Sequence, residues 1–137
     1  MNWNEARIPI LISLLALAGC TNAPRLPYPT DAELMDRFAS QRETFERLAA
    51  DPQDSMAMVA LEITGSRVMP DSEVRFQVWY RDLFGPGGCT KGYAYLKEAP
   101  RTVVDSIGTR WETCPPEDAE LYRKLEGEWY IFYTAVN

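Results

Sequence analysis

The sequence of 137 residues contains no histidine and only three cysteines. The absence of histidine removes the commonest general base, the serine–histidine and cysteine–histidine nucleophile pairs, and the zinc sites that use imidazole. The glycine-rich segment at residues 85–88 lacks the lysine and hydroxyl residue of a P-loop, and Pro86 removes an amide that a phosphate would use. We therefore predict no catalytic residue, no cofactor and no metal ion, and expect that the protein is not an enzyme.

Basic side chains are outnumbered in this chain. It has 14 lysines and arginines against 20 aspartates and glutamates, which gives a net charge of -6. An acidic domain repels nucleic acid and anionic membrane surfaces, so we exclude nucleic acid as a partner. A basic protein partner is compatible with the charge, and so is the simpler explanation that the charge keeps the domain soluble.

Long hydrophobic runs are also missing. Residues 8–18 form an apolar run about half as long as the roughly twenty residues that a membrane-spanning helix needs. A basic residue, Arg7, precedes this run, and Leu17-Ala18-Gly19-Cys20 ends it. This order is typical of a secretory signal, so we predict a signal peptide at residues 1–19. The alternative is an uncleaved apolar helix that carries a cysteine by chance.

The segment Leu17-Ala18-Gly19-Cys20 resembles the lipobox of bacterial lipoproteins. The resemblance implies cleavage before Cys20 and lipidation of that cysteine with two or three acyl chains, which anchor a protein more durably than one chain does. It also implies an outer-membrane location with the domain facing the periplasm, because Thr21 stands where an aspartate would specify inner-membrane retention.

Three prolines and no periodic pattern mark residues 21–29. We predict that residues 20–29 form a lipidated, extended tether. Residues 30–137 are enough for one small globular domain but too few for two.

Two cysteines, Cys89 and Cys114, are left once Cys20 is assigned to lipid. In an oxidising compartment an even number of cysteines favours a disulfide, and closing a loop of about 26 residues stabilises a fold by roughly 3–4 kcal/mol. The alternative is a reactive thiol at Cys89, for which Lys91 is the only nearby basic residue in the sequence.

A capping box, Thr30-Asp31-Ala32-Glu33, predicts the start of a helix. Asp51-Pro52 predicts its end, because proline disfavours helical geometry in the preceding residue. The apolar residues between these points recur at helical spacing and form one stripe: Leu34, Met35, Phe38, Phe45, Leu48 and Ala49.

The middle of the chain is harder to assign. Residues 58–64 form a short apolar run that we predict as a strand, with a buried helical turn as the alternative. Residues 73–84 fit both a strand and a helix. We favour a second amphipathic helix, because Pro70-Asp71-Ser72 offers N-cap chemistry and Gly85 suits a helix C-terminus. A turn is expected at residues 85–88.

Strand patterns dominate the rest of the sequence. Residues 92–97 predict a strand, and residues 121–125 and 128–133 predict a hairpin whose turn uses Gly127. The expected fold class is therefore α+β, with one or two amphipathic helices packed on a small antiparallel sheet that ends in a C-terminal β-hairpin.

Two further groups of residues could bind a ligand. The acidic segment Glu117-Asp118-Ala119-Glu120 lacks the spacing and the glycine of a calcium loop, so we interpret it as a solvated loop. Trp79, Trp111 and Trp129 could form an aromatic platform, but their spacing favours packing in the core.

The mature chain also resembles a group of small bacterial proteins of uncharacterised activity, many of them lipoproteins. The matching segments are Leu34-Met35-Asp36-Arg37-Phe38, Trp79-Tyr80-Arg81-Asp82-Leu83-Phe84, Lys91-Gly92-Tyr93-Ala94-Tyr95, Val103-Val104-Asp105-Ser106 and Leu125-Glu126-Gly127-Glu128-Trp129-Tyr130-Ile131-Phe132-Tyr133. This resemblance supports the fold and the compartment and implies no catalytic residue.

The function expected from the sequence is that of a membrane-anchored, non-catalytic envelope lipoprotein that binds another envelope protein or supports an assembly. One alternative is an inhibitor of a basic enzyme such as lysozyme, which the acidic charge, the disulfide and the anchor together would suit. Another alternative is a small cell-wall hydrolase, which would need two carboxylates facing each other across a pocket.

Overall fold

The computed structural model describes residues 27–83 and 87–136. The predicted signal peptide, Cys20, most of the tether and half of the predicted turn at 85–88 lie outside these residues. The helices are α1 (Asp31–Ser40), α2 (Arg42–Ala50), α3 (Ser55–Ala60) and the 3-10 helix η1 (Thr109–Thr113). The strands are β1 (Gly65–Val68), β2 (Val74–Asp82), β3 (Gly88–Tyr95), β4 (Ala119–Lys124) and β5 (Trp129–Val136).

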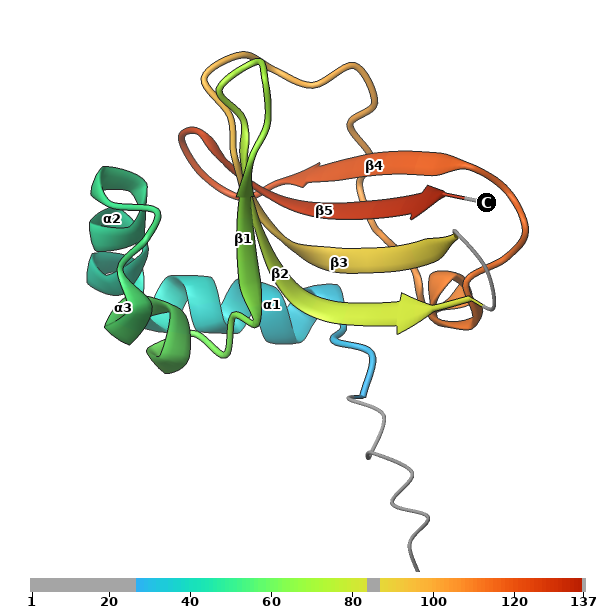
Figure 1. Ribbon diagram of the computed structural model, residues 1–137, viewed down its shortest axis with the longest axis horizontal. Coiled ribbons are helices and arrows are strands. Elements are labelled where there is room, and N and C mark those ends of the chain that lie inside the picture. The colour runs from blue at the N-terminus through green and yellow to red at the C-terminus, as the bar shows by residue number, and fades with distance from the viewer. Residues whose placement is uncertain (1–26, 84–86, 137) are drawn as a thin grey trace, which may run out of the picture.

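The described strands form one antiparallel sheet in the order β1-β2-β3-β5-β4. Helix α1 lies under one face of this sheet, and α2 and α3 lie at one end of it (Figure 1). The predicted α+β class and the C-terminal hairpin are confirmed, and Gly127 has the positive φ of 59° that its turn requires. Within the described ranges, no helix combines the length and the apolar character of a membrane span.

The first predicted helix begins as expected. The amide of Glu33 donates to the Thr30 hydroxyl over 3.2 Å, and the amide of Thr30 donates to the Glu33 carboxylate over 2.7 Å. The prediction of one continuous helix is wrong, because Gln41 leaves helical geometry at φ -127° and ψ 38° and separates α1 from α2. The bend brings the rings of Phe38 and Phe45 to 4.9 Å from each other in the same core.

The prediction of a strand at residues 58–64 is also wrong. Helix α3 occupies Ser55–Ala60, and the Asp54 carboxylate caps it by accepting from the amide of Ala57 over 3.0 Å. The cap residue stands before the apolar run, so the run itself gives no sign of where the helix begins.

The predicted second helix at residues 73–84 is a strand, β2. A β-bulge between Gln77 and Trp79 shifts the register against β3, so the neighbours Val78 and Trp79 are both buried. This shift breaks the strict alternation of a strand and produces apolar spacings that imitate a helix. Ser72, at φ 69°, belongs to the tight turn that joins β1 to β2 and caps no helix.

The core lies between the helices and the sheet and is rich in aromatic rings. Trp129 is at its centre, with the ring of Phe45 at 5.2 Å and that of Phe76 at 5.7 Å. Trp79 and Trp111 are also less than a tenth exposed. The interpretation of the three tryptophans as core residues is therefore confirmed, and they form no surface platform.

The predicted disulfide between Cys89 and Cys114 is present, with 5.8 Å between the two Cα atoms. It joins β3 to the residue that follows η1, and both cysteines are buried. Cys89 is thus not a free thiol, and the Lys91 side chain is committed to an ion pair with Asp31.

Candidate functional site

The sheet face that turns away from α1 is hollowed. β1 and the first half of β2 rise steeply from the layer formed by β3, β5 and β4 (Figure 1). Two adjoining cavities, of about 580 and 230 Å³, lie on this face. We call them together the sheet groove, and the side chains that concern its chemistry are Arg67, Arg75, Gln77, Tyr80, Thr90, Glu120 and Thr134.

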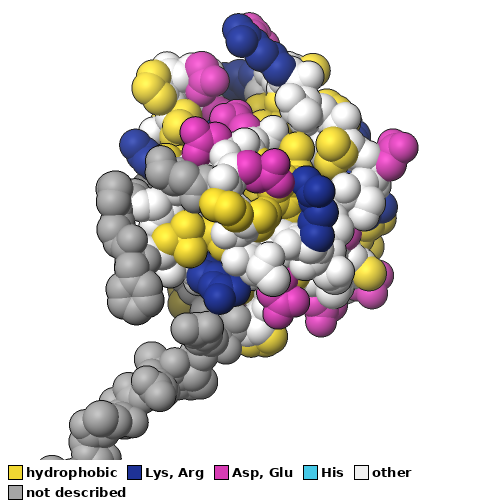
Figure 2. All heavy atoms as spheres, turned by 90° about the vertical axis from the view of Figure 1, so that its right-hand side faces the viewer, with side chains coloured by type: hydrophobic (Ala, Val, Ile, Leu, Met, Phe, Trp, Pro, Cys, Tyr) yellow, Lys and Arg dark blue, Asp and Glu magenta, His cyan; other side chains and the backbone are white. Residues whose placement is uncertain are grey.

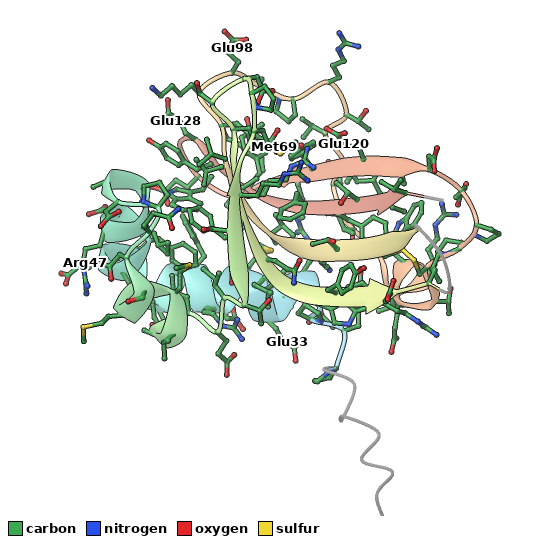
Figure 3. The ribbon with its side chains drawn as sticks, in the orientation of Figure 1. Glu33, Arg47, Met69, Glu98, Glu120 and Glu128 are labelled. Carbon is green, nitrogen blue, oxygen red and sulfur yellow. A yellow bond between two sulfur atoms is a disulfide. The ribbon has the colours of Figure 1, made fainter. Side chains whose placement is uncertain are left out.

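Strand alternation explains why these residues share one face. Thr90 lies opposite Thr134 across β3 and β5, and Arg67 lies opposite Arg75 across β1 and β2. Residues opposite each other in an antiparallel pair point to the same side of the sheet. Figure 3 shows Met69 and Glu120 on the side of the sheet away from α1, whereas Glu33 lies on the opposite side.

A hydrogen-bonded network holds Arg75 in place. Its Nε donates to Glu73 over 2.6 Å, and its Nη2 donates to the hydroxyl of Tyr122 over 2.7 Å and to Glu120 over 3.3 Å. The Tyr122 hydroxyl donates to Glu73 over 2.7 Å. Burial raises the pKa of Tyr122, and its hydrogen bond to Glu73 raises this pKa further, so the hydroxyl stays protonated.

The two carboxylates of this network are both held by hydrogen bonds. Glu73 and Glu120 converge on the same arginine and the same tyrosine, and both also line a third cavity, of about 600 Å³. A general acid or base needs a proton-transfer site that is open to the substrate, and paired carboxylates of a glycosidase lie on opposite sides of the scissile bond. The network therefore positions Arg75 and leaves neither carboxylate without a hydrogen-bond partner.

A second polar network lies on the helix side of the sheet. The Asp31 carboxylate accepts from Lys91 Nζ over 2.8 Å, from Arg123 over 2.7 Å and from the amide of Ile107 over 2.8 Å. Burial raises the pKa of Asp31, but these hydrogen bonds outweigh burial and hold the pKa below its ordinary value. Burial lowers the pKa of Lys91, and the hydrogen bond to Asp31 offsets only part of this effect.

Tyr28 extends this second network toward the predicted tether. Its ring lies 4.4 Å from Lys91 Nζ and packs edge-on against Trp79 at 5.0 Å, and its hydroxyl donates to the carbonyl of Gly108 over 3.2 Å. The packed part of the structure therefore includes Tyr28, which the sequence assigned to the tether.

The acidic segment at residues 117–120 is divided between two environments. Glu117 is half exposed and pairs with Arg110 over 3.3 Å, whereas Glu120 contacts Arg75 in the sheet groove. Among the described residues, no group of three or more acidic or cysteine side chains is arranged to hold a metal ion. Figure 2 shows acidic, basic and hydrophobic side chains interspersed on the end of the molecule where β2 and β5 finish.

The sequence did not predict that the groove residues form a site. Arg67, Arg75, Thr90 and Thr134 are spread over three separate parts of the chain, and only the strand order brings them together. A polar residue at every second position of a strand is the signal that could have revealed them. That signal was hidden in β2, because its bulge made residues 73–84 resemble a helix.

No protein-family model matches this chain, and neither the search of curated proteins nor that of solved structures finds a match.

Proposed function

We propose that this protein is an outer-membrane lipoprotein, anchored by lipid on Cys20 and facing the periplasm, whose domain is a non-catalytic binding module. The sheet groove is the surface that receives its envelope partner. The observation that carries this proposal is the contrast between the two sheet faces. Helices and the larger aromatic core cover one face, whereas the other has a smaller buried cluster of Ala94, Leu96, Tyr122, Tyr130 and Phe132 and, beside it, the open groove.

Two features support the binding role over a catalytic one. Glu73 and Glu120 are both engaged by Arg75 and Tyr122, and such hydrogen bonds favour a positioning role for these carboxylates over proton transfer. Tyr80 is 49% exposed at the rim of the groove, and an exposed aromatic ring beside polar groups is a common feature of binding surfaces.

The disulfide supports the compartment. Cys89 and Cys114 are joined inside the fold, and structural disulfides form and persist in oxidising compartments such as the bacterial periplasm. An exported lipoprotein meets this condition, whereas a cytosolic protein does not.

The anchor is tested by metabolic labelling with palmitate. Wild-type protein expressed in a Gram-negative host is expected to incorporate the label and to fractionate with outer membranes. The Cys20→Ala variant is expected to lose the label, while the double variant Cys89→Ala/Cys114→Ala serves as the matched control and keeps it. Equal labelling of wild type and Cys20→Ala would contradict the anchor.

The binding surface is tested by photo-crosslinking in living cells. A benzoylphenylalanine residue replaces Tyr80 in the groove with a side chain of similar shape, and the control position is Glu46, which is exposed on α2. We expect a discrete adduct from position 80 and none from position 46. Adducts from position 46 alone would place the partner on the helix side and contradict the proposal.

The inhibitor of a basic enzyme is the second candidate, and the net charge of -6 is the observation that favours it. Such binding would weaken steeply with salt, because exposed charges act through fields that ions screen. Co-purification with a cationic lysozyme at low salt, lost on Glu120→Gln substitution, would support this candidate.

A further inference from the structure

We propose that the smaller cavity of the sheet groove binds an oxyanion, a carboxylate or a phosphate group, through Arg67, Arg75, Thr90 and Thr134. We call this cavity of about 230 Å³ the arginine pocket. The inference deepens the proposed function and rests on it, because it names the chemistry of the ligand that the sheet groove receives.

The charge of the arginine pocket differs from that of the whole chain. The described residues that line it include Arg67 and Arg75 but no aspartate or glutamate. The whole chain, in contrast, has a net charge of -6. A pocket with two guanidinium groups and no carboxylate in its wall attracts an anion.

The placement of the two arginines brings two positive charges close together. Arg67 and Arg75 lie directly opposite each other on β1 and β2, and like charges in this position destabilise an antiparallel pair. Glu73 and Glu120 neutralise Arg75, but the side chain of Arg67 makes no ion pair or hydrogen bond with any residue that the structure describes. An anion held between the two guanidinium groups would relieve their repulsion.

Arg75 keeps donor capacity for such an anion. Its hydrogen bonds to Glu73, Glu120 and Tyr122 use Nε and Nη2, so Nη1 has no partner among the residues described here. The network also fixes the guanidinium plane, which lies over the Phe132 ring with 5.5 Å between Cζ and the ring centroid. A guanidinium fixed in this way presents its remaining donors without further ordering.

Two hydroxyl groups complete the set of donors. Thr90 and Thr134 face each other across β3 and β5, and both line the arginine pocket. Neither hydroxyl has a hydrogen-bond partner within residues 27–83 and 87–136. Two arginines and two unpaired hydroxyls, in a cavity wall whose described residues include no carboxylate, match the acceptor oxygens of a carboxylate or phosphate.

The size of the pocket limits what enters it. A volume of about 230 Å³ accommodates a charged group and a few further atoms, and the adjoining cavity of about 580 Å³ leaves room for the rest of a ligand. The anionic group can therefore belong to a free small molecule or to the end of a longer chain, and the experiment has to separate these sources.

The test is a titration of the ¹⁵N-labelled full chain in detergent, followed by amide chemical shifts. The probes are acetate, inorganic phosphate, and an acetylated dialanine with either a free carboxylate or a carboxamide end, all compared with chloride at equal ionic strength. We expect saturable shifts at Thr90 and Thr134 with at least one oxyanion. A carboxylate ligand is indicated if the dialanine acid binds and its amide does not, and a phosphate ligand if phosphate alone binds.

Arg67→Gln is the decisive variant. Losing a charged hydrogen bond is expected to weaken binding by about tenfold or more. The matched control is Arg101→Gln, because Arg101 is also exposed and also makes no ion pair among the described residues. This control is expected to bind like the wild type. Arg67 is exposed, so its variant is expected to keep the wild-type amide spectrum away from the groove.

Two results would overturn the inference: no probe shifts the groove amides beyond the chloride control, or Arg67→Gln binds as well as wild type. The crosslinking experiment then decides whether the proposed function falls with it. Adducts from position 80 without oxyanion binding would remove only the ligand chemistry, whereas the absence of both would remove the groove as a binding site.

Discussion

The Asp31 carboxylate, on the helix side of the sheet, is enclosed by Lys91, Arg123 and the amide of Ile107, and Lys91 is 0% exposed. In the sheet groove on the other face, Glu120 is 61% exposed and only touches the edge of the Arg75 network. The first network is built around a buried carboxylate with three donors, whereas the second leaves Arg67 and part of Arg75 available. Polar groups of the first kind hold a fold together, and polar groups of the second kind are suited to binding.

The largest effect is expected from Asp31→Ala. The change leaves the buried ammonium of Lys91 without its carboxylate, so the free energy of unfolding should fall by about 3–5 kcal/mol. Urea titration followed by tryptophan fluorescence measures this loss. The double variant Asp31→Ala/Lys91→Met removes the unpaired charge and should recover part of the stability. A loss of less than about 1 kcal/mol in the single variant would contradict a buried ion pair between Asp31 and Lys91.

The same carboxylate predicts sensitivity to acid. The pKa of Asp31 is lowered in the folded state, so the folded protein binds this proton more weakly than the unfolded chain does. The stability that this carboxylate contributes is complete above the unfolded-chain pKa of about 3.9 and is lost as the pH falls through the folded pKa. Urea titrations between about pH 5 and pH 2 should show a smaller loss of stability for Asp31→Asn than for wild type.

The next largest effect is expected from removing the disulfide. The double variant Cys89→Ala/Cys114→Ala frees the segment that carries η1, and the expected loss is about 2–4 kcal/mol. Thermal unfolding of the oxidised wild type and the variant compares them directly. Wild type treated with a reductant should approach the variant, and an unchanged melting temperature after complete reduction would show that the bond adds nothing to stability.

A moderate effect is expected from Tyr122→Phe. This variant removes the hydroxyl that joins Glu73 to Arg75, and a hydrogen bond to a charged group contributes about 1.5–3 kcal/mol. Because Arg75 then loses part of its support, oxyanion binding in the groove should weaken along with stability. Tyr95→Phe, on the helix side, is the control and should leave binding unchanged. If Tyr122→Phe bound oxyanions as tightly as wild type, the hydrogen-bonded network would not be needed for binding in the arginine pocket.

The smallest effect on stability is expected from Glu120→Gln. This residue is exposed and its contact with Arg75 is long, so the loss should stay within about 0.5 kcal/mol. The variant removes a negative charge beside the arginine pocket, so oxyanion binding should strengthen. Titration of wild type and variant with the same anion provides the measurement, and weaker binding by the variant would mean that Glu120 takes part in holding the ligand.

Local chemistry in the sequence predicted several elements correctly. The capping box at Thr30 and Glu33 and the turn at Gly127 each depend on a few neighbouring residues, and the structure contains both. The disulfide between Cys89 and Cys114 followed from the compartment that the lipobox implies. The lipobox, the cleavage before Cys20 and the anchor stay predictions, because they lie outside the described residues.

The errors have a common physical cause. The bulge between Gln77 and Trp79 depends on pairing with β3, and the break at Gln41 depends on packing against the sheet, so neither can be seen in a local pattern. The same is true of the candidate site, since Arg67 and Thr134 become neighbours only after the strands have assembled. Contacts between residues far apart in the chain depend on the order of the strands, and local patterns in a single sequence do not predict that order.

The packing of Tyr28 against Trp79 and Lys91 has a consequence for where the domain can work. Only eight peptide steps separate Tyr28 from Cys20, and a fully extended chain covers at most about 3.5 Å per step. If lipid on Cys20 fixes that residue at the membrane as proposed, Tyr28 stays within about 28 Å of the bilayer surface. The sheet groove lies on the other face of the sheet, so it can be farther from the bilayer than Tyr28 only by the width of the domain itself. The proposed partners are therefore envelope components close to the membrane.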